Sequence, residues 1–184
     1  MSFRCADAAT VVLDGQRFDR LYSRFGLMFF QDARAAFAHL HGLIRAGGRT
    51  DFSVWSPARE CPWNVAVMGI IGRYVELPAP IPRAPGPFAL DDKDYIRELL
   101  EGGGFSGIRI DTWEGEQPIG GPGATPREAT TFVLDAMSLG RAFDAVGSEL
   151  RATAEEEISA LFARYYDGSS VQMAAKAYLV SAIA

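Results

Sequence analysis

The sequence has only two cysteines, an acidic balance of charge and no apolar run long enough for a membrane span. Cys5 and Cys61 show no CxxC or histidine-paired spacing, so neither a disulfide framework nor a zinc site is expected, and a reducing cytoplasm is the simplest compartment. A formal net charge of −5 argues against nucleic acid as a ligand. Because a membrane-spanning helix needs roughly 20 apolar residues, no membrane span is expected.

Several familiar catalytic motifs are also missing. There is no GxSxG, no HExxH and no cysteine with a matching histidine, so the commonest hydrolase and zinc-enzyme classes are not predicted. His39 and His41 lie two positions apart on an expected helix, face different directions and cannot hold a metal as a pair. GGGFSG at 102–107 fits GxGxxG but follows a helix instead of opening one, which predicts a helix stop.

The first third of the chain shows regular hydrophobic periodicity. With 48% hydrophobic residues over 184 positions, the chain is long enough for one domain with a substantial core. Strands are expected at 2–7 and 18–24. Asp32 is placed to cap a helix that runs to Gly47, and RTDFSVW at 49–55 alternates as a further strand. Strand, helix, strand in this order predicts a parallel βαβ unit.

The middle of the chain is rich in proline. Residues 56–90 hold most of the prolines, and because proline disrupts helix interiors and central strands, we expect a lid or linker there. A second amphipathic helix is predicted to start at Asp91 or Asp92 and to stop at the glycines of 102–104. SGIRIDTW, residues 106–113, alternates as a strand.

The last third is predicted to be mostly helical. A helical cap is expected over 120–170, with one helix over 126–143 and another opened by a capping box of Thr153 and Glu156. The apolar run Lys176–Ala184 is predicted to form a last, buried strand.

Four stretches occur in a set order: CADAAT at 5–10, FDRLYSRFGLMFF at 18–30, GGRTDFSVW at 47–55 and PGPFALDD at 85–92. Together they resemble the second half of class I S-adenosylmethionine-dependent methyltransferases, in the small-molecule branch related to the ubiquinone and menaquinone C-methylases. The resemblance covers roughly residues 3–113, and the final strand also fits. The SRFGxMFF element is the most specific of these motifs.

The resemblance implies a set of residues that bind S-adenosylmethionine. Asp7 matches the acidic residue that accepts a hydrogen bond from the adenine amine, and Ala8 matches the backbone position beside it. SRFG lies at the carboxyl end of the family's strand four, where open α/β sheets bind ligands, so it implies that Ser23, Arg24 and Phe25 border the cofactor. The alternative for Asp7 is a turn residue, and for Arg24 an ion pair with a carboxylate.

The resemblance also implies an acceptor pocket. Met28, Phe29 and Phe30 would form its wall, and Trp55 and Trp63 would flank it. The alternative is that Phe25, Met28 and Phe29 cover the sheet edge and pack on the first helix, while either tryptophan is a core anchor.

The sequence departs from the family at its start. A glycine-rich loop after strand one and an acidic residue after strand two have no counterpart, and the family strand order is three, two, one, four, five, seven, six. We therefore expect an α/β fold: a partial Rossmann-like sheet of strands three to seven, with the helical cap before the last strand. Residues 1–184 would form a single partial domain. Its strand four would present an unpaired apolar edge that invites a homodimer.

Two explanations of this departure are open. Either the start of the chain is misassigned and the natural protein is a longer, ordinary methyltransferase, or the half-domain is a genuine product that acts without catalysis as an oligomerisation or interaction module. In the first case the expected function is methyl transfer from S-adenosylmethionine to a small acceptor, apolar or aromatic. The sulfonium is already activated, so such chemistry requires alignment more than acid or base groups.

Overall fold

The computed structural model describes residues 3–77, 79–136, 139–144 and 147–184. The chain divides into two compact units. The first comprises Met1–Ala58, Ile81–Trp113 and Lys176–Ala184, and the second comprises Arg59–Pro80 and Glu114–Ala175. Each unit is therefore built from segments that are distant in sequence.

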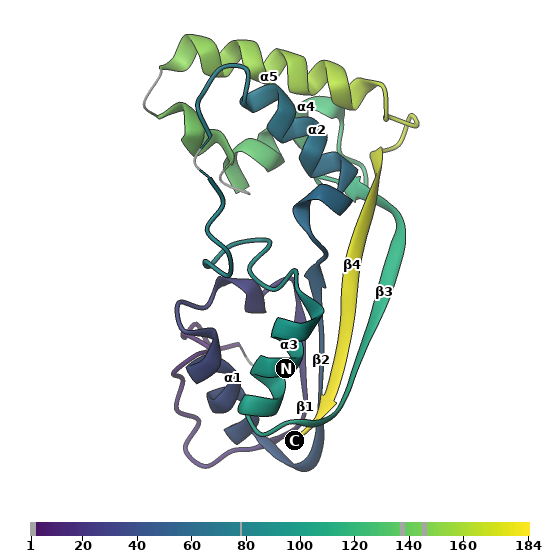
Figure 1. Cartoon of the computed structure of the whole chain (residues 1–184). Helices are drawn as coiled ribbons and strands as arrows, with labels where there is room; N and C mark the ends of the chain where they lie inside the picture. The colour runs from purple at the N-terminus through teal and green to yellow at the C-terminus, as the bar shows by residue number, and fades with distance from the viewer. Residues whose placement is uncertain (1–2, 78, 137–138, 145–146) are drawn as a thin grey trace. The chain divides into compact units, whose positions relative to one another are not determined.

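A four-stranded sheet is the framework of the fold (Figure 1). Its strands are β1 (Phe18–Arg24), β2 (Ile44–Trp55), β3 (Ser106–Ile119) and β4 (Val171–Ile183), in the spatial order β1-β2-β4-β3. β1 runs parallel to β2, and β4 runs antiparallel to it. The predicted α/β class and the parallel βαβ unit are confirmed. β3 begins in the first unit and ends in the second, whereas β4 begins in the second unit and ends in the first.

Helix α1 (Ala33–Gly42) connects the two parallel strands. The Asp32 carboxylate caps it by accepting a hydrogen bond from the Ala35 N–H at 2.9 Å, as predicted. The helix ends at Gly42 instead of Gly47, because Ile44 already starts β2 and pairs with β1. Tertiary pairing has overridden the helical periodicity at this boundary.

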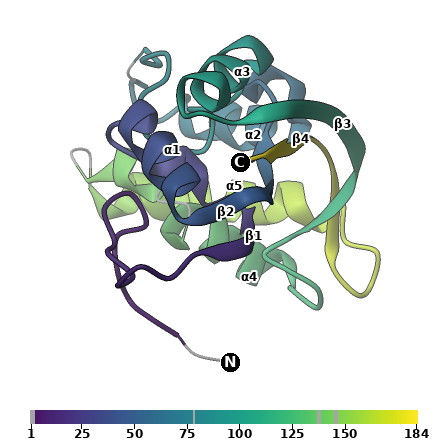
Figure 2. The same ribbon diagram turned by 90° about the horizontal axis from the view of Figure 1, so that it is seen from below.

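Helix α3 (Lys93–Gly102) lies beside α1, on the same side of β2 (Figure 2). Asp92 caps its start, as predicted. A side chain at Gly103 would come within 3.1 Å of the Phe37 backbone, so glycine lets the two helices approach closely. The core here includes the buried side chains of both helices and of β2: Phe37, Leu40, Phe52, Val54, Tyr95, Ile96, Leu99 and Leu100.

The strand expected at 2–7 is absent from residues 3–7, and residue 2 lies outside the described residues. This prediction was wrong because a strand needs a neighbour to pair its backbone groups, and the described chain provides none here. Phe3 is 88% exposed, and the segment runs into a turn at 8–10.

The proline-rich stretch 56–90 contains a helix that the sequence did not predict, α2 (Pro62–Ile71). Proline fits here because Pro62 occupies the first helical turn, where a backbone N–H has no intrahelical partner. Residues 79–92 form turns and loops. Residue 78 of this stretch lies outside the described residues.

The predicted cap 120–170 holds α4 (Pro126–Thr131) and α5 (Ser148–Ala163). Residues 137–138 and 145–146 of this range lie outside the described residues. The capping box is at Thr125 and Glu128, whose reciprocal hydrogen bonds lower the pKa of the Glu128 carboxyl. The box predicted at Thr153 was wrong, because Thr153 lies inside α5 and its hydroxyl donates to the Glu149 carbonyl.

The histidines and the glycine stretch have structural roles. His39 Nε2 lies 3.0 Å from the Val11 carbonyl oxygen. The rings of His41 and Phe105 meet edge to face, with their centroids 5.0 Å apart. Gly103 is the C-cap of α3, so GGGFSG ends a helix as predicted. The described residues hold no cluster of three or more histidine, cysteine or acidic side chains placed for a metal. No helix in the described ranges is long and apolar enough to cross a bilayer.

Candidate functional site

The carboxyl ends of β1 and β2 are the first place to look for a ligand site. Parallel strands of an open α/β sheet present their ligands at that edge. β1 ends at Arg24 and β2 ends at Trp55, and the register pairs Arg24 with Ser53. The two strand ends therefore meet, and residues that follow β1 lie against the last residues of β2.

Phe25 and Trp55 form a stacked aromatic pair at this edge. Their ring centroids are 4.2 Å apart, with an angle of 19° between the planes. Phe25 has a φ of +56°, a left-handed conformation that is rare for a bulky side chain. Its N–H donates to the Ser53 carbonyl at 3.0 Å, and this bond together with the stack holds the unusual conformation. The structure thus joins two of the sequence-predicted site residues.

Ser23 and Arg24 precede this pair at the end of β1. A side chain at Gly26 would lie 2.9 Å from Ser23 Oγ, so glycine allows the chain to turn tightly against the half-buried serine. Arg24 is exposed, and no acidic side chain among the described residues forms an ion pair with it. The ion-paired alternative for this arginine is not what the structure has. Arg24 remains available to an anionic or polar ligand.

Met28, Phe29 and Phe30 do not share one environment. Met28 is 2% exposed and its carbonyl accepts a hydrogen bond from the Gly86 N–H at 3.0 Å. Phe29 is 53% exposed and Phe30 is half-buried. Met28 thus serves the core, whereas Phe29 offers an apolar surface to solvent.

Asp7 and Ala8 are both exposed and lie at a turn. Asp7 Oδ1 accepts a hydrogen bond from the Ala9 N–H at 2.9 Å, and the Asp7 carbonyl accepts one from the Val11 N–H. This is the turn geometry expected of an aspartate that organises its own backbone. The same carboxylate is open to solvent and to a ligand amine.

Trp55 belongs to the first compact unit and Trp63 to the second. Trp55 is 8% exposed and Trp63 is 1% exposed. Trp63 lies in α2 of the second unit, where it is one of the largest fully buried side chains. Each tryptophan therefore anchors the core of its own unit.

The loop that contains Gly86 was not predicted to be part of the site. Its hydrogen bond to Met28 places PGPF beside the segment that follows β1. Arg83, in the same loop, has a φ of +63° and its guanidinium lies 4.1 Å from the centroid of the Tyr95 ring. The signal was available, because PGPFALDD was one of the motifs of the resemblance.

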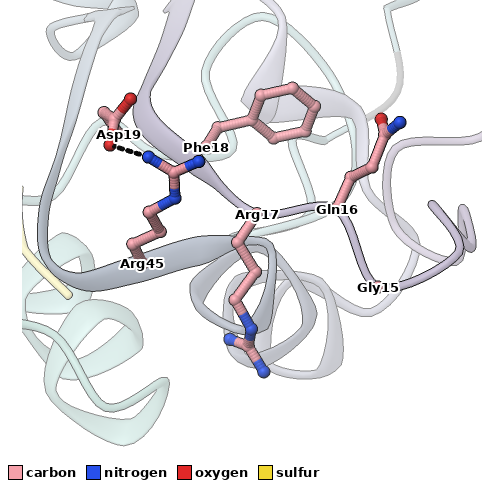
Figure 3. A pocket seen from close by; sticks show the side chains of 6 residues that line it. All are labelled: Gly15, Gln16, Arg17, Phe18, Asp19 and Arg45. Carbon is pink, nitrogen blue, oxygen red and sulfur yellow. Dashed lines mark hydrogen bonds and ion pairs between the residues drawn. The ribbon is translucent and has the colours of Figure 1, made fainter.

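A surface hollow of about 600 Å³ lies at the opposite, amino end of β1 (Figure 3). Arg45 Nη1 and Asp19 Oδ1 are 2.6 Å apart across it. Arg17 donates to the Gly42 carbonyl at 2.7 Å, at the end of α1. Both arginines are thus occupied with the protein, and the hollow is separate from the strand ends that hold Arg24.

A second hollow, of about 570 Å³, lies between α2 and α5 in the second unit. Its floor is apolar, with Ile70 and Leu161 both buried. Glu157 lies at this hollow, forms an ion pair with Arg73 and accepts a hydrogen bond from the Tyr74 hydroxyl at 2.7 Å. That hydrogen bond raises the pKa of Tyr74.

No protein-family model matches the chain, and no curated protein matches it in sequence. Solved structures do match in fold. The structure from Anabaena variabilis that is described as a methyltransferase of an antibiotic biosynthesis pathway is 14% identical. It has a TM-score of 0.54, and the match covers 97% of this chain and 72% of that one.

Two further matches have lower TM-scores. The YcgJ protein of Bacillus subtilis is 13% identical with a TM-score of 0.49, covering 97% of this chain and 68% of that one. A phosphoethanolamine N-methyltransferase of Haemonchus contortus, in complex with phosphomonomethylethanolamine and S-adenosylhomocysteine, is 14% identical with a TM-score of 0.47. This chain covers 36% of its length. From the Anabaena match and the sheet order, the chain has a Rossmann-like fold of the methyltransferase type.

Proposed function

We propose that this chain takes part in methyl transfer from S-adenosylmethionine to a small acceptor that is apolar or aromatic. The observation that carries the proposal is the strand order β1-β2-β4-β3 with β4 antiparallel to β2. It equals the order four, five, seven, six in the methyltransferase family that the sequence resembles. Fold alone does not fix a reaction, so the residues at the strand ends are the second support.

The residues at the carboxyl ends of β1 and β2 fit part of the cofactor. The exposed Arg24 and the half-buried ring of Phe25, which is held by its stack on Trp55, suit a molecule with both a polar group and an aromatic base. Asp7 keeps an exposed carboxylate for the adenine amine, with Ala8 beside it. When bound, S-adenosylmethionine supplies the activated methyl group, and this chain's part is to bind and orient.

The acceptor would be selected near Phe29. Phe29 is the exposed aromatic of the segment after β1, which favours an apolar or aromatic acceptor. This chain spans 36–57% of the length of three solved structures that it matches, so the activity of a complete enzyme is part of the proposal. The exposed Cys5 and the absence of a cysteine framework favour the cytoplasm.

The test is a calorimetric titration of S-adenosylhomocysteine into the purified chain, Arg24→Ala and a matched control, Arg45→Ala. Both arginines are exposed, but Arg45 lies at the other end of β1 and is paired with Asp19. We expect binding by the parent and by Arg45→Ala, and at least roughly tenfold weaker binding by Arg24→Ala, which loses a hydrogen bond to a charged group.

Each outcome decides a different point. Equal affinity of all three variants would remove Arg24 from the site. No heat from a chain that circular dichroism shows to be folded would contradict cofactor binding by this chain. The non-catalytic interaction module would then be the better description.

A further inference from the structure

The outer edge of β1 is open. The sheet order places β1 at one end, and no other strand of the described chain pairs with its outer side. Phe25 donates its N–H to β2, and because successive residues of a strand point their backbone groups to alternate sides, those of Tyr22 and Arg24 point away from β2. An edge of this kind is a template for another strand.

Two aromatic side chains are exposed along this edge. Tyr22 is 76% exposed and Phe18 is 45% exposed. Arg20 and Arg24, on the same face, are exposed too, and neither forms an ion pair with any described residue. Tyrosine and arginine are enriched at the centres of protein interfaces. The composition of this edge therefore suits a protein partner.

The sequence of β1 is complementary to itself. When a twofold axis joins two identical strands into one continuous sheet, residues opposite each other must have side chains on the same face. They are therefore both even-numbered or both odd-numbered, and the axis passes through a residue. With the axis at Leu21, each Arg20 faces Tyr22 of the partner strand, which permits a cation–π contact. Asp19 faces Ser23 in this register. Phe18 lies beyond an irregularity between Phe18 and Arg20, and its N–H donates to the Leu43 carbonyl, so it is not part of the paired segment.

The neighbouring registers are unfavourable. An axis at Arg20 places Arg20 opposite the partner's Arg20. An axis at Tyr22 places Arg20 opposite the partner's Arg24. Like charges directly opposite each other destabilise a strand pair. Charge therefore disfavours both adjacent registers, and an axis at Leu21, the midpoint of Phe18–Arg24, gives the longest overlap of the two strands.

We propose that two copies of this chain pair antiparallel through β1, with Leu21 of each strand opposite the other. The hollow at the amino end of the partner's β1 (Figure 3) then adjoins the candidate site. Each site thus takes Arg24 and Phe25 from one copy and borders the amino end of β1 of the other copy. That last step rests on the proposed function, whereas the pairing itself does not.

Single cysteines test the register directly. In a Cys5→Ser background, we would oxidise Leu21→Cys, Arg20→Cys and Tyr22→Cys and separate the products on a non-reducing gel. Residues opposite each other at a non-hydrogen-bonded position are about 4.5 Å apart at Cα, which a disulfide can span. We expect a covalent dimer from Leu21→Cys alone, although the other two positions are more exposed to random collision.

A second variant tests the edge without cross-linking. Tyr22→Pro removes an N–H that points away from β2, a substitution that edge strands tolerate. We expect sedimentation equilibrium to show a concentration-dependent dimer for the parent and only monomer for this variant, with the same circular dichroism. A monomeric parent without the Leu21→Cys cross-link would overturn the proposal. A cross-link at Arg20→Cys or Tyr22→Cys instead, or a Tyr22→Pro dimer, would overturn it as well.

Discussion

β1 and β4 flank the same central strand but differ in almost every other respect. β1 has seven residues, none of them buried, and pairs on one side only. β4 has 13 residues, alternates buried with more exposed positions, and lies between β2 and β3. The strand end that carries the candidate site is therefore the less protected one. We therefore expect β1 to open locally more readily than β4, because fewer of its residues are buried.

The largest effect should come from matched tyrosines on the two strands. Tyr178 in β4 is 7% exposed, with Lys93 Nζ 4.8 Å from its ring centroid, and Tyr22 in β1 is 76% exposed. We expect Tyr178→Ala to lower the free energy of unfolding by roughly 3 kcal/mol, because it leaves a cavity. Tyr22→Ala should change it by less than about 0.5 kcal/mol in urea unfolding of dilute protein. Equal losses would mean that β1 is covered in solution.

The next effect concerns the backbone at the end of β1. Phe25→Ala and Phe25→Gly both lose the stack on Trp55, but only glycine accepts the φ of +56° without strain. We expect the glycine variant to be more stable than the alanine variant by about 1 kcal/mol in thermal unfolding. Alanine at least as stable as glycine would show that the left-handed conformation is not kept once the ring is gone.

A pH-dependent effect is expected at the start of β4. The backbone N–H groups of Ser170 and Ser169 donate to the Asp167 carboxylate and lower its pKa. A pKa lowered by folding contributes stability above the unfolded value of about 3.9, and this contribution is lost as the pH falls through the folded value. Asp167→Asn should therefore be less stable than the parent at pH 7, and the difference should shrink below pH 4.

Urea unfolding of both proteins across this pH range measures the effect. A difference that stays constant down to pH 2 would assign the loss to the turn geometry and not to ionisation.

The smallest effect is expected at the amino end of β1. Arg45 and Asp19 form an ion pair whose side chains are 61% and 78% exposed. Exposed pairs of this kind contribute roughly 0–1 kcal/mol, so a double-mutant cycle with alanine should give a coupling energy of less than about 0.5 kcal/mol. A larger coupling would indicate that this hollow is drier in solution than its exposure implies.

Local patterns predicted the elements whose signals are local. β1 was predicted with its observed bounds, and Asp92 with the glycines after α3 fixed that helix at both ends. The capping box shows the limit of such patterns. Both Thr125 and Thr153 are followed three residues later by glutamate, and only tertiary packing decides which one starts a helix.

The features that were not predicted depend on partners far away in the sequence. The strand at 2–7 failed because pairing requires a neighbour that no local pattern reveals. The stack of Phe25 on Trp55 and the contact of Gly86 with Met28 join separate motifs at one sheet edge. The resemblance placed the first pair near a ligand, but their direct contact and the backbone strain at Phe25 required the structure.

The position of β4 also affects how the chain folds. β4 comes last of the four strands in sequence and lies between two strands made earlier. During synthesis, β2 and β3 therefore each have an unpaired edge until β4 has been made. Pairing between strands that are distant in sequence is slow, and unpaired edges are prone to aggregation. Substitutions that weaken β4 should thus reduce the yield of folded protein from the ribosome as well as the stability of protein already folded.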